Sequence, residues 1–288
     1  MYFRWDWLRP QLTAPIVPTL GPIHPDALTV DIFEDILRVA DTGDFLPYDK
    51  DRRWGGEKDE RVLRDDVVHQ REHTLIPTLM RHGRGTVKVF AYGFPDSVTE
   101  EATELVAKLA ARHDVVNARV VRPLGPETTH PRGTRIQLKD FATGPCPTTD
   151  GPVRPVTDWP TAVQETFAPF AEAMAGEGLA FLHTRMQAGR CGPVLVAAIA
   201  DRIVGAIGPM EVRPDATDRP QLMPQYFAVL PEVRGRGLGR VLWRAAMHWG
   251  QSHGAAYQLL QTEVDGPSDR LCQSEGLAYL GFTHTTSA

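Results

Sequence analysis

The chain has 288 residues, 42% of them hydrophobic and 23% charged, with a formal net charge of -5 at pH 7. This composition is ordinary for a soluble globular protein of one or two domains, and it excludes a fibrous or largely disordered chain. A mildly acidic chain offers no basic surface for nucleic acid, so we expect no nucleic-acid partner.

The three cysteines, Cys146, Cys191 and Cys272, are odd in number and far apart. This pattern fits the reduced thiols of a cytoplasmic protein better than a disulfide framework. The amino terminus lacks the apolar region of a secretory signal, and the longest aliphatic run, residues 194–200, is too short to span a bilayer. We therefore expect a soluble cytoplasmic protein with no membrane partner.

In the first part of the chain, residues 26–41 carry apolar side chains at helical spacing, which predicts a helix. Residues 42–84 are densely charged with both signs. They predict a solvated surface with a helix over residues 61–82, kinked near Pro77.

Three histidines in that predicted helix raise the question of a metal site. His69 and His73 are four residues apart and would share one helix face, and His82 follows. No third ligand stands at a spacing typical of a metal site, so we expect none.

A strand, helix, strand unit follows. Residues 86–92 alternate like a strand, residues 97–100 form a capping box that opens a helix, and residues 115–121 form a second strand. The next stretch, 122–133, is rich in proline and glycine and predicts a linker.

The linker divides the chain into an N-terminal α/β domain of unclear role, residues 1–130, and a C-terminal domain, residues 134–288. The C-terminal domain is expected to contain a strand, two helices, a hairpin, a strand, a helix and a strand, over residues 134–140, 162–189, 193–208, 225–230, 238–252 and 257–264. Residues 209–224 predict a long polar loop. Because the unit at 86–121 has the same order as 225–264, a degenerate duplicate of the second domain is an alternative for the first.

The turn before the helix at 238–252 has the sequence RGRGLGR, residues 234–240. Helix amino termini present unpaired N–H groups and partial positive charge, which favour phosphate, and glycines let the backbone approach closely. The apolar stripe of the helix predicts its buried face at Leu238, Val241, Leu242, Ala245, Ala246 and Trp249, and His253 with Gly254 predicts its end.

Two common phosphate loops do not fit this turn. The dinucleotide fingerprint needs glycines at other spacings and an acidic residue about twenty positions on. A P-loop needs a terminal G-K-[ST], which is absent.

The stretch does resemble motif A of the GNAT superfamily of acyl-CoA-dependent N-acyltransferases, with Val229, Pro231, Arg234, Gly237 and Gly239 in the motif positions. The resemblance covers the second half of the chain. It implies an α/β (α+β) fold with a mixed, mostly antiparallel twisted sheet flanked by helices. It also implies acetyl-CoA as cosubstrate, bound by Ala228, Val229, Arg234, Gly235, Arg236, Gly237, Leu238, Gly239 and Arg240.

Motif B of that family can be placed in two registers. One puts its terminal G-F on Gly281 and Phe282. The other, which we prefer, puts it on Gly276 and Leu277 and leaves residues 278–288 as the next strand. In the preferred register Cys272 replaces the family tyrosine that often protonates the departing CoA thiolate. A thiol has suitable acidity for that step, but a buried structural cysteine is the favoured alternative.

The resemblance implies direct attack of an amine on the thioester, with a main-chain N–H near Val229 as oxyanion donor. Glu263, at the end of a strand, is our choice of general base; Glu211, Asp215 and Asp218 are the other candidates. Each of these has the alternative of a solvated carboxylate.

We therefore expect an N-acetyltransferase acting on a small-molecule amine. The alternative is a non-catalytic acyl-CoA-binding sensor or partner-interaction module, which loss of the tyrosine would favour. The usual last strand of the family is absent, so we expect another segment, from the N-terminal half, to complete the sheet edge. A homodimer is compatible with the sequence.

Overall fold

The computed structural model describes residues 16–288 except 43, 58, 82, 94–96, 128–132, 145, 147–150 and 152. The chain forms two compact units. Unit 1 contains residues 1–138 and 259–288, and unit 2 contains residues 139–258. This division differs from the predicted domains 1–130 and 134–288, because the last thirty residues group with the N-terminal half.

Unit 1 contains most of one large sheet. Its strands follow the order β15-β8-β16-β7-β6-β5-β3, and β4 also pairs with β5. The strands are β3 (Arg61–Val62), β4 (Val68–His69), β5 (His73–Met80), β6 (Thr86–Gly93), β7 (Asn117–Leu124), β8 (Thr134–Asp140), β15 (Tyr257–Glu263) and β16 (Ala278–Ser287). A small hairpin joins β1 (Ile16–Val17) to β2 (Gly21–Pro22).

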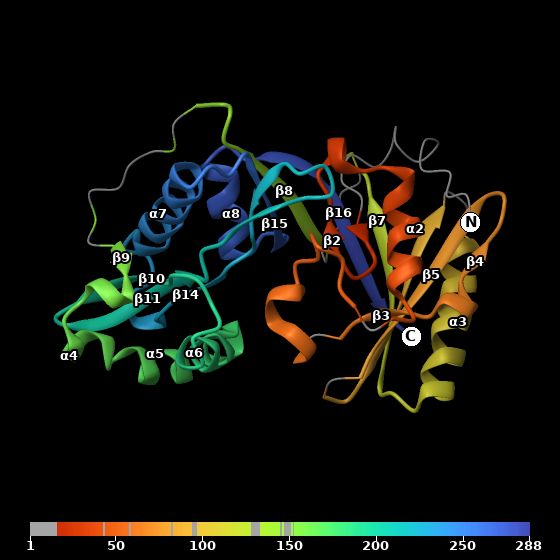
Figure 1. The fold of residues 1–288 in the computed structure, drawn as a ribbon, viewed down its shortest axis with the longest axis horizontal. Helices are drawn as coiled ribbons and strands as arrows, with labels where there is room; N and C mark the ends of the chain where they lie inside the picture. The colour runs from red at the N-terminus through yellow and green to blue at the C-terminus, as the bar shows by residue number, and fades with distance from the viewer. Residues whose placement is uncertain are drawn as a thin grey trace. The chain divides into compact units, whose positions relative to one another are not determined.

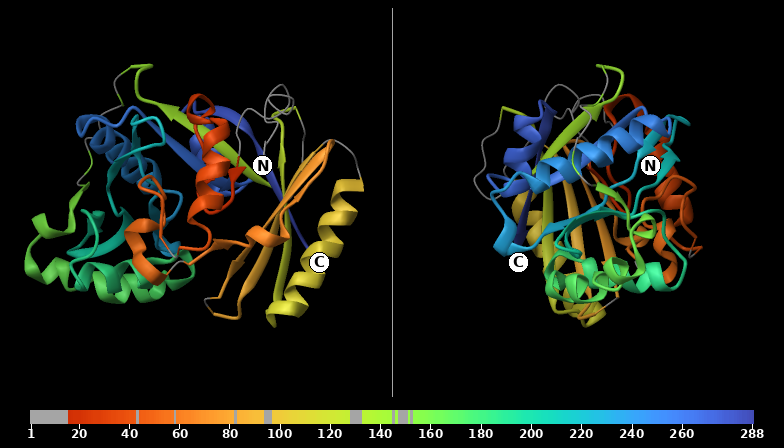
Figure 2. Two further views of the ribbon diagram at one scale, coloured as in Figure 1. Left: turned by 45° about the vertical axis from the view of Figure 1, so that its right-hand side comes forward. Right: turned by 90° about the vertical axis from the view of Figure 1, so that its left-hand side faces the viewer.

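The helices of unit 1 are α2 (Val30–Val39), α3 (Ser97–His113), α8 (Pro267–Ser274) and the short 3-10 helices η1 (Pro25–Ala27), η2 (Arg52–Glu57) and η3 (Arg64–Asp66). Helices α2 and α3 confirm two of the three helices that the sequence predicts in the first half of the chain. Figure 2 shows α3 lying along one face of the strands β5 to β7. Strands β6 and β7 are parallel, so the predicted strand, helix, strand unit is confirmed.

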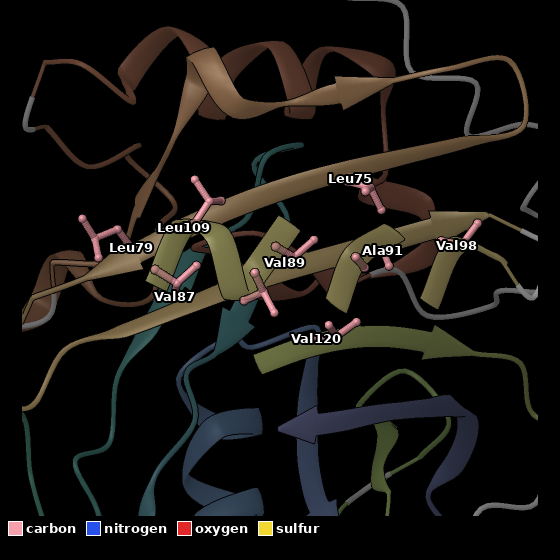
Figure 3. Packing of buried hydrophobic residues seen from close by; sticks show 10 residues of the cluster. Leu75, Leu79, Val87, Val89, Ala91, Val98, Leu109 and Val120 are labelled. Atoms are coloured by element: carbon pink, nitrogen blue, oxygen red, sulfur yellow. The ribbon is translucent and has the colours of Figure 1, made fainter. Parts of the chain in front are cut away.

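A hydrophobic core cluster of this unit lies between α3 and the sheet (Figure 3). Alternate residues of the strands point toward the helix, because successive side chains of a strand face opposite sides. The residues of this cluster are Leu75, Leu79, Val87, Val89, Ala91, Val98, Ala102, Val106, Leu109 and Val120.

The prediction of a helix over residues 61–82 is wrong. This stretch contains β3, η3, β4 and β5, and Pro77 lies inside β5 opposite Val89. The carbonyl of Pro77 accepts a hydrogen bond from Leu63 N on the side away from β6. The missing N–H of the proline faces that same side, so the ladder between β5 and β6 is not interrupted.

The strand predicted at the end of the chain is confirmed as β16, and its pairing shows which segment completes the sheet edge. It pairs antiparallel with β8 on one side and with β7 of the N-terminal half on the other. A strand from the N-terminal half therefore completes the sheet at this point, as the sequence suggests.

Unit 2 is built on an antiparallel sheet in the order β14-β11-β10-β9. The strands of unit 2 as a whole are β9 (Val153–Pro155), β10 (Leu195–Ile199), β11 (Arg202–Gly208), β12 (Val212–Pro214), β13 (Pro220–Leu222) and β14 (Tyr226–Val229). Its helices are η4 (Val156–Asp158), α4 (Thr161–Gln164), α5 (Phe167–Ala173), η5 (Ala175–Glu177), α6 (Leu179–Gln187), η6 (Pro231–Val233) and α7 (Leu238–Ser252).

Helices cover both faces of this sheet. Helix α7 packs on one face of β10 and β11, and α4, α5 and α6 lie on the other (Figure 1). The predicted hairpin of β10 and β11 is confirmed, and Gly178, which adopts a left-handed conformation, stands at the start of α6. In the described part of the chain, no helix is long and apolar enough to cross a membrane.

The predicted polar loop at residues 209–224 is instead a hairpin of β12 and β13, with Val212 opposite Leu222. Leu222 is fully buried. Short strands with polar outer faces give no clear period in the sequence, which explains why this hairpin was not expected.

The buried face of α7 is turned slightly from the predicted stripe. It consists of Leu242, Trp243, Ala246, Met247 and Gly250. Trp249 is only half-buried and stacks on the ring of His253 at 3.8 Å between ring centroids. The helix ends at Ser252 as predicted, and the following Gly254 is left-handed.

Candidate active site

The glycine-rich turn lies between β14 and α7. After β14 the chain makes the single turn η6, extends at Arg234, and then passes through two left-handed glycines, Gly235 and Gly237, with φ of 78° and 79°. Gly237 caps α7, and no side chain in the described part of the chain provides a capping hydrogen bond. The first N–H groups of α7 are therefore available to a ligand.

The space around these glycines is open. A Cβ atom at Gly235 or Gly237 would meet no atom within 4 Å, and at Gly239 it would meet only the Phe227 ring at 3.5 Å. The turn needs glycine for its backbone conformation and not for close packing in the protein itself. An anion can consequently approach the backbone here.

The arginines of the turn have different surroundings. Arg234 Nε donates a hydrogen bond to the Val229 carbonyl at 2.9 Å, which fastens the turn to the end of β14. Arg236 and Arg240 are exposed and add positive charge beside the helix terminus. Arg234 thus has a positioning role that the sequence did not indicate.

Strand β14 is at the edge of its sheet. It pairs with β11 through Gly205 opposite Val229 and Ala206 opposite Ala228. A Cβ at Gly205 would lie 2.8 Å from Leu242 of α7, so the glycine lets the helix pack close behind β14. An edge strand with an open helix terminus a few residues after it can hold an extended, amide-bearing ligand that ends in phosphates.

Residues 159–273 match the family model described as the acetyltransferase (GNAT) family. This part of the chain is a GNAT acetyltransferase domain. The match includes β14, the turn and α7, so the resemblance of motif A is confirmed. A search of curated protein sequences found no significant match.

Several solved structures of GNAT proteins are similar to this chain. The GCN5-related N-acetyltransferase from Sphaerobacter thermophilus is 13% identical, with 92% of this chain and 87% of that chain covered and a TM-score of 0.50. The tandem GNAT protein from the clavulanic acid biosynthesis pathway is 15% identical, with coverages of 88% and 93% and a TM-score of 0.48. The first likeness extends through the N-terminal half and shows a shared fold, which confirms the predicted GNAT-like α/β class.

Asp215, one of the candidate bases in the GNAT domain, has a structural position. Its carboxylate accepts hydrogen bonds from the Tyr257 hydroxyl at 2.7 Å, from the Thr217 N–H and hydroxyl at 2.8 Å, and from the Arg219 N–H at 3.0 Å. Burial acts to raise the pKa of Asp215, but these hydrogen bonds hold it below its ordinary value. The carboxylate is saturated with donors and holds the turn between β12 and β13.

The other two acids of this segment also differ in their surroundings. Glu211 is half-buried and pairs with Arg213 at 2.5 Å between Oε1 and Nε. Asp218 is exposed, in a left-handed conformation at the hairpin tip. Neither lies in the glycine-rich turn.

Glu263 and Cys272 belong to unit 1. Glu263 is the exposed last residue of β15, and Cys272 lies on α8 with 3% of its surface accessible. Burial, with the nearby carboxylate of Asp269 second, raises the pKa of the Cys272 thiol to about 12. Helix α8 ends at Ser274 and Gly276 is left-handed, which agrees with the preferred register of motif B.

The sequence did not indicate the role of Asp269, a fully buried carboxylate in the first turn of α8. Its Oδ1 forms an ion pair with Arg135, whose Nε lies 2.8 Å away, and it accepts hydrogen bonds from Gln137 Nε2 and Thr262 Oγ1 at 3.0 Å each. Its Oδ2 accepts from the Asp265 N–H at 3.0 Å. This one side chain ties α8 to β8 and β15, and an acid placed at the start of a helix after a proline was the available signal.

Proposed function

We propose that this protein transfers an acetyl group from acetyl-CoA to the amine of a small molecule. The observation that carries the proposal is the open, left-handed Gly235 and Gly237 at the amino terminus of α7, next to the edge strand β14. In the proposed complex the N–H groups of residues 234–240 bind the pyrophosphate. The main chain of Ala228 and Val229 pairs with the pantetheine arm.

In the proposed reaction the amine attacks the thioester carbonyl while both substrates are bound. An N–H near Val229 stabilises the oxyanion, because a fixed donor costs no reorganisation as charge develops. Arg236 and Arg240 add positive charge that neutralises phosphate oxygens. Glu263 is proposed as the general base, since it is exposed and ends a strand.

The high pKa of Cys272 weighs against it as the acid that protonates the CoA thiolate. An acid works best when its pKa is near the working pH, and burial has moved this thiol far above it. We therefore propose a structural role for Cys272, with the thiolate taking its proton from water. The same observation supports a second candidate function, an acyl-CoA sensor without turnover.

The test is the release of free thiol from acetyl-CoA by the purified full chain, with and without each member of a panel of small amines. Amine-dependent thiol release supports the acyltransferase and ranks its acceptors. Tight binding of acetyl-CoA with no release from any amine supports the sensor. Glu263→Gln tests the base: an unchanged rate constant would remove Glu263 from the mechanism.

A further inference from the structure

Unit 1 contains a cavity of about 270 Å³ that none of the acetyl-CoA residues lines. Val87, Val89 and Val120 face α3, so the alternate residues of β6 and β7 face the opposite side of the sheet, where the cavity lies. The hairpin of β1 and β2 contributes to its wall. The cavity is thus a second concave site, on the sheet face away from α3.

The cavity has an apolar inner part and a polar outer part. Phe90, Val121 and Thr283 are almost fully buried, whereas Arg119 and Thr285 are exposed. Phe90 lies opposite Val121, and Val121 opposite Thr285, in one row across three strands. A ligand can therefore bury an apolar body while its polar end stays near the opening.

Three cations and one anion line this space. Lys88 and Arg119 are direct register partners on parallel strands and point to the same face. Like charges placed directly opposite each other destabilise a sheet. Glu60 compensates one of them, with its Oε1 3.1 Å from Lys88 Nζ. Among the described residues, the side chain of Arg119 has neither a hydrogen bond nor an ion pair.

Lys50 is the third cation of the lining. Its Nζ donates to the Thr19 carbonyl at 2.9 Å and pairs with Asp51 at 2.7 Å. Burial acts to lower the pKa of Lys50, but Asp51, Glu60 and Asp49 hold it above its ordinary value, so the side chain stays charged at neutral pH. Because Lys50 and Lys88 each have a carboxylate partner, the exposed guanidinium of Arg119 is the positive charge that an anion at the opening would pair with.

We propose that this cavity binds a small organic anion, with a carboxylate or phosphate monoester between Lys88 and Arg119 and an apolar body against Phe90 and Val121. The hydroxyls of Thr283 and Thr285 are placed to add hydrogen bonds. A volume below the roughly 300–1,000 Å³ of drug-sized sites fits a small metabolite and excludes a polymer.

The experiment is calorimetric titration of the full chain with benzoate, phenyl phosphate and the neutral benzamide. We expect at least one of the two anions to bind at millimolar concentration, and benzamide to bind about tenfold more weakly or not at all. Preference for benzoate identifies a carboxylate site, and preference for phenyl phosphate a phosphate site.

Two variants with opposite expected effects place the anion in this cavity. Arg119→Gln weakens anion binding about tenfold, because it removes the unpaired cation. Glu60→Gln strengthens it severalfold, because it releases Lys88 from its partner. The matched control is Arg122→Gln on the same strand: Arg122 donates to Thr99 of α3 and so faces the other side of the sheet.

The proposal is overturned if no anion binds at millimolar concentration or if benzamide binds as well as benzoate. It is also overturned if Arg122→Gln weakens binding as much as Arg119→Gln does. Thermal unfolding of each variant confirms that the chain is folded. Arg119 is exposed and unpaired among the described residues, so its substitution leaves the melting temperature nearly unchanged.

Discussion

The guanidinium of Arg234 donates a hydrogen bond from Nε to the carbonyl of Val229 at 2.9 Å. The bond joins the last residue of β14 to the first arginine of the glycine-rich turn. It fixes the angle at which the chain leaves the strand, and hence where the N–H groups of α7 point. The geometry of a guanidinium matters here as well as its charge.

Arg234→Lys therefore weakens acetyl-CoA binding although it keeps the charge. We expect a loss of about tenfold, because a charged hydrogen bond of this kind contributes roughly 1.5–3 kcal/mol. Titration calorimetry measures it. Arg236→Lys, at an exposed residue of the same turn, is the control and keeps its affinity. If Arg234→Lys binds as the wild type does, the positioning role of Arg234 is wrong.

Cys272→Ala tests whether the buried thiol is structural. Truncating a buried side chain leaves a small cavity, so we expect a loss of about 1–2 kcal/mol in the free energy of unfolding. The pH profile of amine-dependent thiol release stays unchanged. A loss of the rate constant by more than about a hundredfold, with the fold intact, would instead identify Cys272 as the acid.

Asp215→Asn tests the carboxylate that holds the hairpin of β12 and β13. Because the pKa of Asp215 is lowered in the folded state, its contribution to stability is present above the unfolded value of 3.8 and is lost as pH falls below it. We expect Asp215→Asn to lower the free energy of unfolding by about 2 kcal/mol at pH 7, as measured by urea unfolding. This loss becomes smaller in strong acid. Asp218→Asn, at the exposed and left-handed neighbour, changes stability little at either pH. Equal effects of the two substitutions would contradict this account.

Asp49 gives the opposite pH dependence. Burial raises its pKa to about 6, although the Asp51 N–H and Lys50 act to lower it. A raised acid pKa means that stability is greatest below the unfolded value of 3.8 and is lost as pH rises through 6. Asp49→Asn therefore stabilises unit 1 at pH 8 and has little effect at pH 3.5. Asp51→Asn, which removes the carboxylate that pairs with Lys50, lowers stability at pH 8. Destabilisation by Asp49→Asn at pH 8 would show that its ionised form is favoured.

Local patterns in the sequence predicted the elements that depend on them. The apolar stripes predicted α2, α3 and α7, and the glycines of RGRGLGR predicted an open turn before α7. The strand β5 was missed because its charged flanks are typical of a solvated helix and Pro77 was interpreted as a kink in that helix. The strands that pair with β5 on both sides cannot be seen in its own sequence. Tertiary pairing decided its structure.

Contacts between distant residues could not be predicted. Asp269 accepts a hydrogen bond from Gln137, which is 132 positions away in the chain. The pairing of β16 with both β8 and β7 likewise joins the C-terminal residues to the N-terminal half. Hydrophobic periodicity says which face of a strand is buried, but it does not say which strand is the neighbour.

The central claim is that the turn at the start of α7 binds the pyrophosphate of acetyl-CoA, and paired glycine substitutions at the two ends of that helix test it most directly. Gly237 and Gly254 have φ of 79° and 81°, and a Cβ at either meets no atom within 4 Å. Alanine at each therefore brings a similar strain, about 1–2 kcal/mol.

Titration of the wild-type chain and the two variants with acetyl-CoA separates strain from binding. The account predicts that the wild type binds acetyl-CoA, that Gly237→Ala lowers the affinity at least about tenfold, and that Gly254→Ala leaves it unchanged. Equal affinities of the two variants, or no binding by the folded wild type, would contradict it.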